Sequence, residues 1–592
     1  MHNVLDTFTK AQQLAITHHK GPCFVLAGPG SGKTRVITHR VSYLINHYQI
    51  PSEQILTITF TKLAALEMKE RFLLLCPKSN AIFCTFHSCF YQILKSSKLN
   101  YPQQFITSET KERILMSCSK QILANINTST LKDIEKWMSI CINALFEVEL
   151  PPEIEFNIED LEKIFNLYQK QLLEQCLVDY DMILIDTYQL LNSNEMIRNK
   201  WQKQFRFIQI DECQDMNRLQ YEVVKLVAGK DKNIFIVGDD DQSIYRFRGS
   251  DISLLKKFTR EFEPVTQILL DTNFRSANAI VEASQTMIQE NTNRFQKEIR
   301  SNNLIKEGLE IKSFVSRDEM SKHVVEALKN APETFLTDRA IICRTNGEVR
   351  MWSHFMRRNK IEYVAKEERI SIYDEEWFLD LEAYIRIGIC RFVTKDVVRI
   401  LNKPNRNLNR DDVESCKLPT VLEKIQLTIN GMRPYLALKY ILNGIGYHKW
   451  LKLKFKNDQD KYDEICETID HILEDSKGYI TAEDWLQNIE EDRREYKENK
   501  NLGHKNENCT GVNILTMHAS KGLEFDTVYL PEINKGKMPR GFLLDEDTIQ
   551  EERRLLYVAM TRAKSHLEIL YIKGTEGHKL QPSVFIEPLL NN

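Results

Sequence analysis

The sequence lacks the features that mark membrane, exported and metal-ribbon proteins. No apolar run approaches the roughly 20 residues that cross a bilayer, and the chain does not begin with a basic segment followed by an apolar one. The 13 cysteines are scattered and form no Cys-x-x-Cys pair, which argues against a zinc ribbon or an iron–sulfur cluster. We therefore expect reduced core thiols in a cytoplasmic protein that makes no membrane contact.

The sequence also lacks an excess of charge of either sign. It has 80 Lys and Arg residues against 83 Asp and Glu residues, a net charge of -3. A strongly basic composition would have pointed to a nucleic-acid binder. Binding requires only one positive groove, however, so near-neutrality neither indicates nor excludes it. The case for a nucleic acid must therefore rest on motifs.

What the chain does have is length and a repeated architecture. Its 592 residues exceed one hydrophobic core, so several domains are expected. Short apolar strands alternate with amphipathic helices, which is typical of parallel sheets with covered faces. Helical periodicity replaces this pattern twice. The sequence predicts an α/β fold in six segments: 1–88 and 182–275 (first α/β unit), 89–181 (its helical insertion), 276–373 and 509–592 (second unit), and 374–508 (its insertion). Within the last, the polar stretch from Glu490 to Asn508 is predicted to be an exposed loop.

A glycine-rich loop is the strongest single motif. Ala27-Gly28-Pro29-Gly30-Ser31-Gly32-Lys33-Thr34 follows an apolar strand and opens an amphipathic helix, with Ala27 where the P-loop pattern usually has glycine. The glycines let backbone N–H groups turn toward phosphate oxygens, and the helix presents its positive end to the same anion. Lys33 can reach the β- and γ-phosphates, and the Thr34 hydroxyl can ligate Mg²⁺. The alternative is a plain glycine turn between strand and helix.

A nucleotide site of this kind also needs acids and cations. Asp211 and Glu212 end an apolar strand, so Asp211 is predicted to bind Mg²⁺ and Glu212 to polarise the attacking water. An acidic pair after a strand is common, and it gains weight only beside the P-loop. Arg275 and Arg562 stand in contexts that suit stabilisation of the transferred phosphoryl group. Chemistry alone, however, favours a surface ion pair for each.

Eight segments then occur in one order along the chain. They are Ala27 to Arg35, Thr59 to Thr61, Thr85 to Ser88, Asp211 to Asp215, Gly238 to Gly249, Asn273 to Ser276, Thr516 to Phe525 and Tyr557 to Ala563. Together they resemble a superfamily 1 helicase of the UvrD/Rep/PcrA type, over about residues 5–572. The resemblance implies two RecA-like motor domains, 1A and 2A, with the insertions as subdomains 1B and 2B. It also implies an ATP-dependent 3′–5′ DNA helicase.

The resemblance implies roles for individual residues. At the nucleotide, Gln12 would read the adenine edge, Arg35 and Phe274 would flank the base, Gln242 would link the γ-phosphate to DNA, Arg275 and Arg562 would contact the γ-phosphate, and Glu524 would lie between the nucleotide and DNA sites. The implied DNA residues are Phe60, Thr85, His87, Tyr245, Phe247, Arg248, Thr516 and His518. Aromatic faces stack unpaired bases at ~1–3 kcal/mol each. Without the resemblance, Tyr245 to Arg248 fits half-buried packing equally well, and His87 and His518 fit capping or core roles.

The sequence departs from the family pattern at a few positions. Phe247 replaces a usual Trp and Phe274 a usual Tyr, and both keep an aromatic face for stacking. Lys62 replaces a common Asn and Cys213 a common Tyr. The sequence ends at Asn592, so we expect neither a long partner-binding tail nor a C-terminal nuclease domain.

The expected cofactors are ATP and Mg²⁺, and the expected partners are single-stranded and tailed duplex DNA. ATP is predicted to bind between the two α/β units and to draw them together, which would move the aromatic track along the strand. One alternative is an accessory translocase or motor subunit that serves a protein partner, such as a nuclease or repair factor, without processive unwinding alone. Another is an ATP-dependent switch that binds nucleic acid without moving. RNA as the substrate also stays open. The sequence does not set the oligomeric state, for which a monomer is the default expectation.

Overall fold

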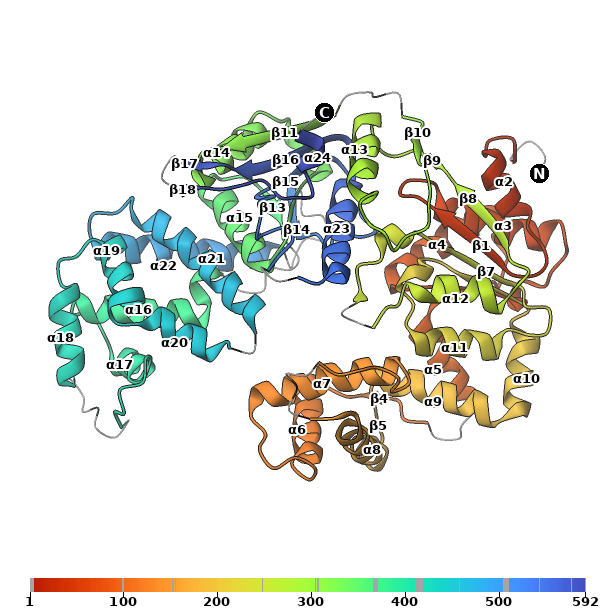
Figure 1. Cartoon of the computed structure of the whole chain (residues 1–592), viewed down its shortest axis with the longest axis horizontal. Helices are drawn as coiled ribbons and strands as arrows, with labels where there is room; N and C mark the ends of the chain where they lie inside the picture. The colour runs from red at the N-terminus through yellow and green to blue at the C-terminus, as the bar shows by residue number, and fades with distance from the viewer. Residues whose placement is uncertain are drawn as a thin grey trace. The chain divides into compact units, whose positions relative to one another are not determined.

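The chain forms two compact units (Figure 1). Unit 1 comprises Met1–Glu307 and Leu544–Thr561, and unit 2 comprises Gly308–Leu543 and Arg562–Asn592. The computed structural model describes residues 5–97, 101–151, 154, 156–246, 249–303, 305, 308–365, 371–409, 413, 419–456, 458–503, 511–541, 544–575 and 578–590. None of the helices in these ranges is long and apolar enough to cross a membrane.

Unit 1 is built on a six-stranded sheet in the order β3-β2-β6-β7-β1-β8. The strands are β1 (Cys23–Ala27), β2 (Ile55–Thr59), β3 (Ile82–Thr85), β6 (Phe207–Ile210), β7 (Ile234–Gly238) and β8 (Thr266–Leu270). Every neighbouring pair is parallel. Parallel strands need crossover connections, which cover both faces of the sheet, so β2 and β7 are buried along their whole lengths. The helices of this layer are α2 (Lys10–Thr17), α3 (Lys33–Asn46), α4 (Lys62–Leu75), α11 (Arg218–Val227) and α12 (Ser253–Glu261).

A helical insertion separates β3 from β6. It contains α5 (Phe86–Ser97), α6 (Ser108–Ser119), α7 (Thr128–Asn143), α8 (Ile158–Glu174), α9 (Tyr180–Ser193) and α10 (Glu195–Gln204), together with the short parallel pair β4 (Gln104–Phe105) and β5 (Leu177–Val178). Its apolar side chains share one core with the sheet, because Ile58 of β2 belongs to the same buried cluster as Phe90 of α5 and Ile134 of α7. The insertion and one face of the sheet are therefore packed as a single body.

Unit 2 has a second six-stranded parallel sheet, in the order β11-β16-β15-β12-β14-β13. Its strands are β11 (Leu309–Phe314), β12 (Arg339–Cys343), β13 (Tyr363–Val364), β14 (Val512–Thr516), β15 (Phe525–Leu530) and β16 (Ala563–Ile572). The helices α14 (Arg317–Lys329) and α15 (Asn346–Arg358) pack on this sheet, and Trp352 of α15 is fully buried in its core. Beyond β16 come the short antiparallel pair β17 (Gly574–Thr575) and β18 (His578–Lys579) and the helix α24 (Glu587–Leu590).

The insertion of unit 2 has a core of its own. It comprises α16 (Glu376–Gly388), α17 (Thr394–Ile400), α18 (Thr420–Ile429), α19 (Pro434–Lys439), α20 (Tyr447–Lys454), α21 (Gln459–Ser476) and α22 (Ala482–Gly503). Its apolar cluster is separate from the cluster of the sheet. Ion pairs join it to α15: Arg350 contacts Glu464 at 2.7 Å, and His354 Nδ1 lies 3.0 Å from Asp492 Oδ1. Charge therefore contributes to this internal contact alongside packing.

The helix α23 (Glu546–Met560) belongs to unit 1, although it lies between β15 and β16 in the sequence. It packs on α13 (Asn278–Ile288), and Arg554 donates to the Asn293 carbonyl at 2.7 Å. The short parallel pair β9 (Thr272–Asn273) and β10 (Arg300–Ser301) flanks α13 in the sequence. Residues 276–307 and 544–561, which the sequence places in the second α/β unit, belong to unit 1. The six-segment division stays a prediction.

The structure confirms the predicted α/β fold with two parallel sheets and abundant helices. One local prediction is wrong: the stretch expected to be a loop from Glu490 is helical as far as Gly503, while residues 504–508 of that stretch lie outside the described ranges. The reason is an apolar stripe that the many charges obscure. Trp485, Ile489 and Tyr496 are all buried, and their spacing of four and seven residues places them on one helix face.

Candidate nucleotide and nucleic-acid site

The candidate residues of unit 1 gather at one edge of its sheet, because parallel strands all end on the same side. Thr85 ends β3, Phe60 follows β2, Asp211 and Glu212 follow β6, Asp239 to Gln242 follow β7, and the glycine-rich loop follows β1. The strand order β3-β2-β6-β7-β1 therefore places the predicted DNA residues Thr85 and Phe60 at one end of this edge and the phosphate loop toward the other. Glu212 and Gln242 come between them.

The glycine-rich loop has the geometry of a phosphate cradle. Gly30 and Gly32 adopt φ values of 67° and 82°, which only glycine takes without strain. A Cβ atom on Gly30 would lie 2.8 Å from Asn273 Oδ1, and one on Gly28 would lie 2.6 Å from Ile299 Cδ1. A side chain at either glycine would therefore collide with Asn273 or Ile299. Helix α3 begins at Lys33, directly after Gly32, so its free N–H groups face this space.

Gln12 and Arg35 lie next to the loop, but through different contacts. The buried Gln12 amide donates from Nε2 to the Ser31 carbonyl at 2.9 Å, and its oxygen accepts from the Thr9 N–H at 3.0 Å. This fixes the side chain against the phosphate loop. Arg35 is exposed, donates to the Thr7 hydroxyl at 3.0 Å and lies over the Phe8 ring at 4.1 Å. The Gln12 side chain is thus bonded to the loop itself, and the Arg35 side chain is held by Thr7 and Phe8 near the start of the chain.

Glu212 of the acidic pair faces Lys33, the lysine of the phosphate loop. Lys33 Nζ is 3.6 Å from Glu212 Oε1, and Gln214 donates to Glu212 Oε2 at 2.5 Å. Glu212 has a left-handed φ of 51°, which turns the chain sharply at the end of β6. Asp211 is buried. The Asp211 carboxylate and the Thr34 hydroxyl are hard oxygen ligands at the same sheet edge, and this donor chemistry suits Mg²⁺.

Cys213, one of the departures from the family pattern, is a packing residue. Its thiol is fully buried, and burial, together with the charges of Glu212 and Asp211, raises its pKa well above the ordinary value. A Cβ on Gly238 would come within 2.6 Å of its Sγ. The neutral thiol therefore fills the space beside the glycine that ends β7.

Phe274 and Arg275 are tied to the phosphate loop from the side of β8. The Phe274 N–H donates to the Gly30 carbonyl at 2.9 Å, while its ring is 45% exposed. The Asn273 side chain accepts from the N–H groups of Arg275 and Ser276 at 2.7 and 2.8 Å. The Arg275 guanidinium donates to the Thr561 carbonyl at 3.3 Å. The exposed Phe274 is therefore anchored to the phosphate loop through its backbone.

The predicted DNA residues of unit 1 that the structure describes are half-buried or buried. Phe60 packs edge-on against Phe86, with ring centroids 5.3 Å apart. The Thr85 hydroxyl accepts from the Ser88 N–H at 3.2 Å and so caps α5. Burial lowers the pKa of His87, against the opposing charge of Asp179, and keeps the imidazole neutral near pH 7. Tyr245 is half-buried. Phe247 and Arg248 lie outside the described residues.

Tyr180 is a candidate that the sequence analysis missed. Its side chain is 56% exposed at the start of α9, in edge-on contact with His87 at 5.5 Å and next to the exposed Phe105 at 5.1 Å. The three rings form a row within the insertion, which begins directly after β3. The only local signal is an aromatic residue directly after the helix cap Asp179. In a chain with 21 tyrosines that signal is too weak to single it out.

The candidate residues of unit 2 lie at both ends of its sheet. Thr516 ends β14 and is level with Cys343 of β12, whereas Thr527 of β15 is level with Arg339. Cys343 and Arg339 are four residues apart on β12, which is roughly 13 Å along the strand. The segment between Thr516 and Thr527, which carries His518 and Glu524, therefore runs back over that distance. Glu524 pairs with Lys564 at 2.9 Å, and the buried Arg562 donates to the Leu523 carbonyl at 3.2 Å. One short segment therefore joins Thr516 and His518 to Glu524 and Arg562.

Three features define this protein as a P-loop nucleoside-triphosphatase motor. They are a glycine loop that opens a helix, a lysine that faces a carboxylate, and a second parallel α/β unit. Comparison with known proteins narrows this class. The UvrD/REP helicase N-terminal domain matches residues 8–263, and the UvrD-like helicase C-terminal domain matches residues 268–441 and 448–574. The chain belongs to the UvrD/REP helicase family.

Full-length relatives show the same likeness. The ATP-dependent DNA helicase PcrA of Staphylococcus aureus is 29% identical over 100% of this chain and 88% of its own length. A probable DNA helicase II homolog of Mycoplasma capricolum subsp. capricolum is 30% identical over 99% of this chain and 88% of its own. The similarity therefore extends over both α/β units and both insertions.

Proposed function

We propose that this ATP-dependent DNA helicase moves 3′ to 5′ along single-stranded DNA in the cytoplasm and unwinds duplex DNA ahead of it. Family membership supports the helicase activity. The observation that carries the coupling is the strand order of unit 1. It puts the residues proposed for DNA, for γ-phosphate sensing and for phosphate binding side by side on one sheet edge.

At the nucleotide, we assign the chemistry to residues whose positions suit it. The loop Ala27 to Thr34 would cradle the phosphates, and Lys33 would neutralise their charge. Thr34 and Asp211 would hold Mg²⁺, which supplies further charge neutralisation. Glu212, 3.6 Å from Lys33, would orient and deprotonate the attacking water. Arg275 and Arg562 would stabilise the charge that develops on the transferred phosphoryl group, a role worth roughly 10³–10⁵ in rate.

At the DNA, we assign an aromatic track to exposed and half-buried rings. Phe60, Tyr245 and, from sequence alone, Phe247 would stack on unpaired bases, and Tyr180 would extend the track onto the insertion. Stacking reads no sequence, since every base has a π-face. Thr85, Arg248, Thr516 and His518 would contact the backbone or bases between them. Gln242, which follows β7, would couple this track to the γ-phosphate.

A strand-displacement assay on two tailed duplexes tests the proposal. A duplex with a 3′ single-stranded tail should be unwound with ATP, and a duplex with a 5′ tail should not. The Lys33→Ala variant is the negative control, and the exposed Lys20→Ala variant should behave like the wild-type protein. Unwinding from the 5′ tail alone would overturn the polarity.

The same assay separates the helicase from its alternatives. Failure to unwind either duplex, together with ATP-dependent displacement of streptavidin from a biotinylated strand, would identify an accessory translocase. Loss of both activities, with DNA-stimulated ATPase retained, would identify a switch that does not move. Equal ATPase stimulation by RNA and DNA would contradict the DNA preference.

A further inference from the structure

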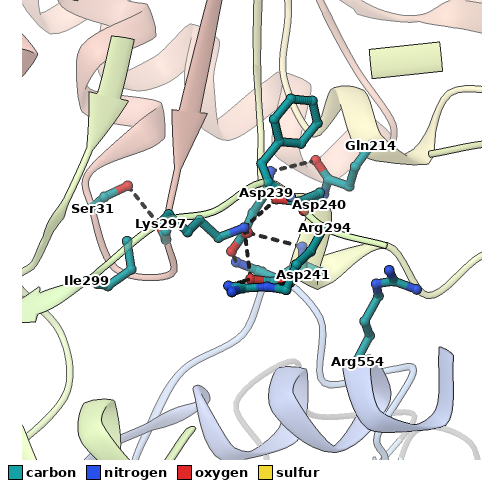
Figure 2. Close-up of polar contacts among 12 residues, drawn as sticks. Ser31, Gln214, Asp239, Asp240, Asp241, Arg294, Lys297, Ile299 and Arg554 are labelled. Carbon is teal, nitrogen blue, oxygen red and sulfur yellow. Dashed lines mark hydrogen bonds and ion pairs between the residues drawn. The ribbon is translucent and has the colours of Figure 1, made fainter. Parts of the chain in front are cut away.

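Three consecutive carboxylates, Asp239, Asp240 and Asp241, lie buried at the end of β7 (Figure 2). Their side chains have no exposed surface. Ionised carboxylates are costly to bury unless cations and hydrogen bonds compensate them. These three buried carboxylates therefore require a cation beside them.

That cation is Lys297, from the segment that follows α13. Lys297 Nζ is 2.8 Å from Asp239 and 2.8 Å from Asp241, it also bonds Asp240, and its side chain is fully buried. Arg294 adds two bonds to Asp241, at 3.0 and 2.6 Å. Two cations thus serve three carboxylates. Burial alone would lower the pKa of Lys297, but the three carboxylates raise it, so the ammonium stays charged.

Asp239 also hydrogen-bonds residues of the candidate nucleotide site. Its Oδ2 accepts from Gln242 Nε2 at 2.7 Å, and its N–H donates to Gln214 Oε1 at 3.0 Å. Gln214 in turn donates to Glu212 at 2.5 Å. A continuous chain of polar contacts therefore runs from Lys297 through Asp239 to both Gln242 and Glu212.

The electrostatics of Asp239 agree with this chain. Burial acts to raise the pKa of Asp239, but the charges of Lys297 and Lys33 and the Gln242 amide lower it overall, so the carboxylate is ionised and accepts from Lys297 and Gln242. The neighbouring Asp240 differs, because burial raises its pKa despite Lys297. Lys297 thus helps to keep Asp239 charged.

The segment carrying Lys297 also contacts the phosphate loop. Ile299, two residues on, lies where a Cβ on Gly28 would meet it at 2.6 Å. Gln285 of α13 holds Ile299 at both its N–H (2.7 Å) and its carbonyl (2.5 Å). One short segment therefore touches the loop at Gly28 and the acidic cluster at Asp239.

We propose that Lys297 is a positioning residue for ATP hydrolysis, which holds Asp239 so that Gln242 and Glu212 face the γ-phosphate in the geometry that hydrolysis needs. This inference rests on the proposed function of Gln242 and Glu212. Lys297 itself touches no substrate. Its removal should therefore lower kcat while leaving ATP binding, made by the phosphate loop and Gln12, nearly intact.

The test measures DNA-stimulated ATPase in Lys297→Met, Gln242→Ala and the double variant. Lys297→Met should lower kcat on the order of 10- to 100-fold, because misplacing a reacting group by about 1 Å costs as much, with little change in KM for ATP. Since Lys297 acts partly through Gln242, adding Lys297→Met to Gln242→Ala should cost less in kcat than Lys297→Met costs alone. Lys256→Met, an exposed lysine that bonds Asn293 beside the same segment, should match wild type.

A charge-balanced variant covers the risk that Lys297→Met fails to fold. Lys297→Met with Asp240→Asn removes one cation and one carboxylate, so the net charge of the cluster is unchanged. The amide oxygen that Asp240→Asn introduces can still accept from the Phe295 N–H, as the Asp240 carboxylate does at 2.6 Å. A low kcat in this folded variant supports positioning through Asp239. Recovery of wild-type kcat would overturn it, as would fully multiplicative effects of Lys297→Met and Gln242→Ala.

The proposed nucleotide site and the proposed role of Lys297 can be tested separately. If Lys33→Ala keeps its ATPase activity, the proposed nucleotide site is wrong, and the role of Lys297 fails with it. If Lys33→Ala is inactive but folded Lys297→Met retains the wild-type kcat, only the positioning role is wrong.

Discussion

Among single residues, Glu212 is the one whose surroundings define a chemical task most closely. It takes a left-handed backbone conformation at the end of β6, faces Lys33 at 3.6 Å and accepts a bond from Gln214 at 2.5 Å. These contacts hold the carboxylate in one orientation beside the phosphate loop. A base that is held in place in this way reacts without first having to reorganise.

Replacement of Glu212 by Gln should separate binding from hydrolysis. The amide keeps the size of the side chain but cannot accept a proton, so ATPase turnover should fall roughly 10²–10⁴-fold. Affinity for a fluorescent ATP analogue should change little. Turnover within about twofold of wild type would show that another group serves as the base. The conservative variant Glu222→Gln, on α11, should leave turnover unchanged.

Tyr180 gives a residue-scale test of the extended DNA track. Tyr180→Ala removes a ring that is 56% exposed, and loss of one stacked base costs ~1–3 kcal/mol, or roughly 5- to 150-fold in affinity for a single-stranded oligonucleotide. Tyr180→Phe keeps the aromatic face and should bind like wild type. Fluorescence anisotropy measures both. Equal affinity of Tyr180→Ala and wild type would remove Tyr180 from the track.

At the scale of elements, the two insertions are attached to their motor sheets in different ways. The insertion of unit 1 shares a continuous apolar core with its sheet, whereas the insertion of unit 2 has its own core. Ion pairs supplement the latter contact, with α15 supplying the cations and the insertion the carboxylates. The stability of the second attachment should therefore depend on pH.

Asp492 of α22 tests this dependence on pH. Burial acts to raise its pKa, but His354 and Arg357 lower it from 3.8 to about 2. A lowered carboxylate pKa adds stability that is complete above about pH 4 and is lost as pH falls toward 2. Asp492→Asn leaves the buried Arg357 guanidinium without a charged partner and should cost roughly 3–5 kcal/mol in urea unfolding near pH 7. The gap to wild type should shrink below about pH 4.

The matched control for Asp492 lies two residues further along the same helix. Arg494 is exposed, so Arg494→Ala should unfold like wild type at every pH. A stability gap between Asp492→Asn and wild type that stays constant down to pH 2 would show that the ion pairs do not carry the effect.

At the scale of the whole molecule, the near-neutral composition hides a local property. The net charge is -3, yet the protein is a DNA helicase. Attraction to the phosphate backbone must then come from a confined basic region rather than from the overall charge. A strand held partly by phosphate contacts releases counterions when it binds.

Binding of single-stranded DNA should therefore weaken with salt despite the negative net charge. For a single strand, log K falls with log salt by about 0.7 per neutralised phosphate. Titration of a fluorescent oligothymidylate at several salt concentrations gives this slope. A polyglutamate of similar length is the control, since a non-specific polyanion should bind far more weakly. A slope of zero would mean that stacking alone holds the strand.

Much of the fold and of the candidate nucleotide site could be predicted from sequence, because both depend on local patterns. The phosphate loop needs glycines, a lysine and a hydroxyl at fixed spacing, and strand β1 before it is plainly apolar. The polar loop expected from Glu490 failed, because charges on the exposed face of α22 outnumber its buried stripe. Tyr180 and Lys297 carry no motif. Their neighbours, His87 and Asp239, are distant in sequence and meet them only in the folded chain.

By itself, the sequence determined the class of this protein: two parallel α/β units, a phosphate loop, an acidic pair and the family to which they belong. These follow from short segments whose chemistry is set by adjacent residues. Only the tertiary structure decided which strands lie side by side, and therefore that Glu212 and Gln242 fall between the proposed DNA and nucleotide residues. It also decided that three aspartates share one buried lysine. The physical reason is that strand order and burial are set by packing across the whole unit, which no local pattern records.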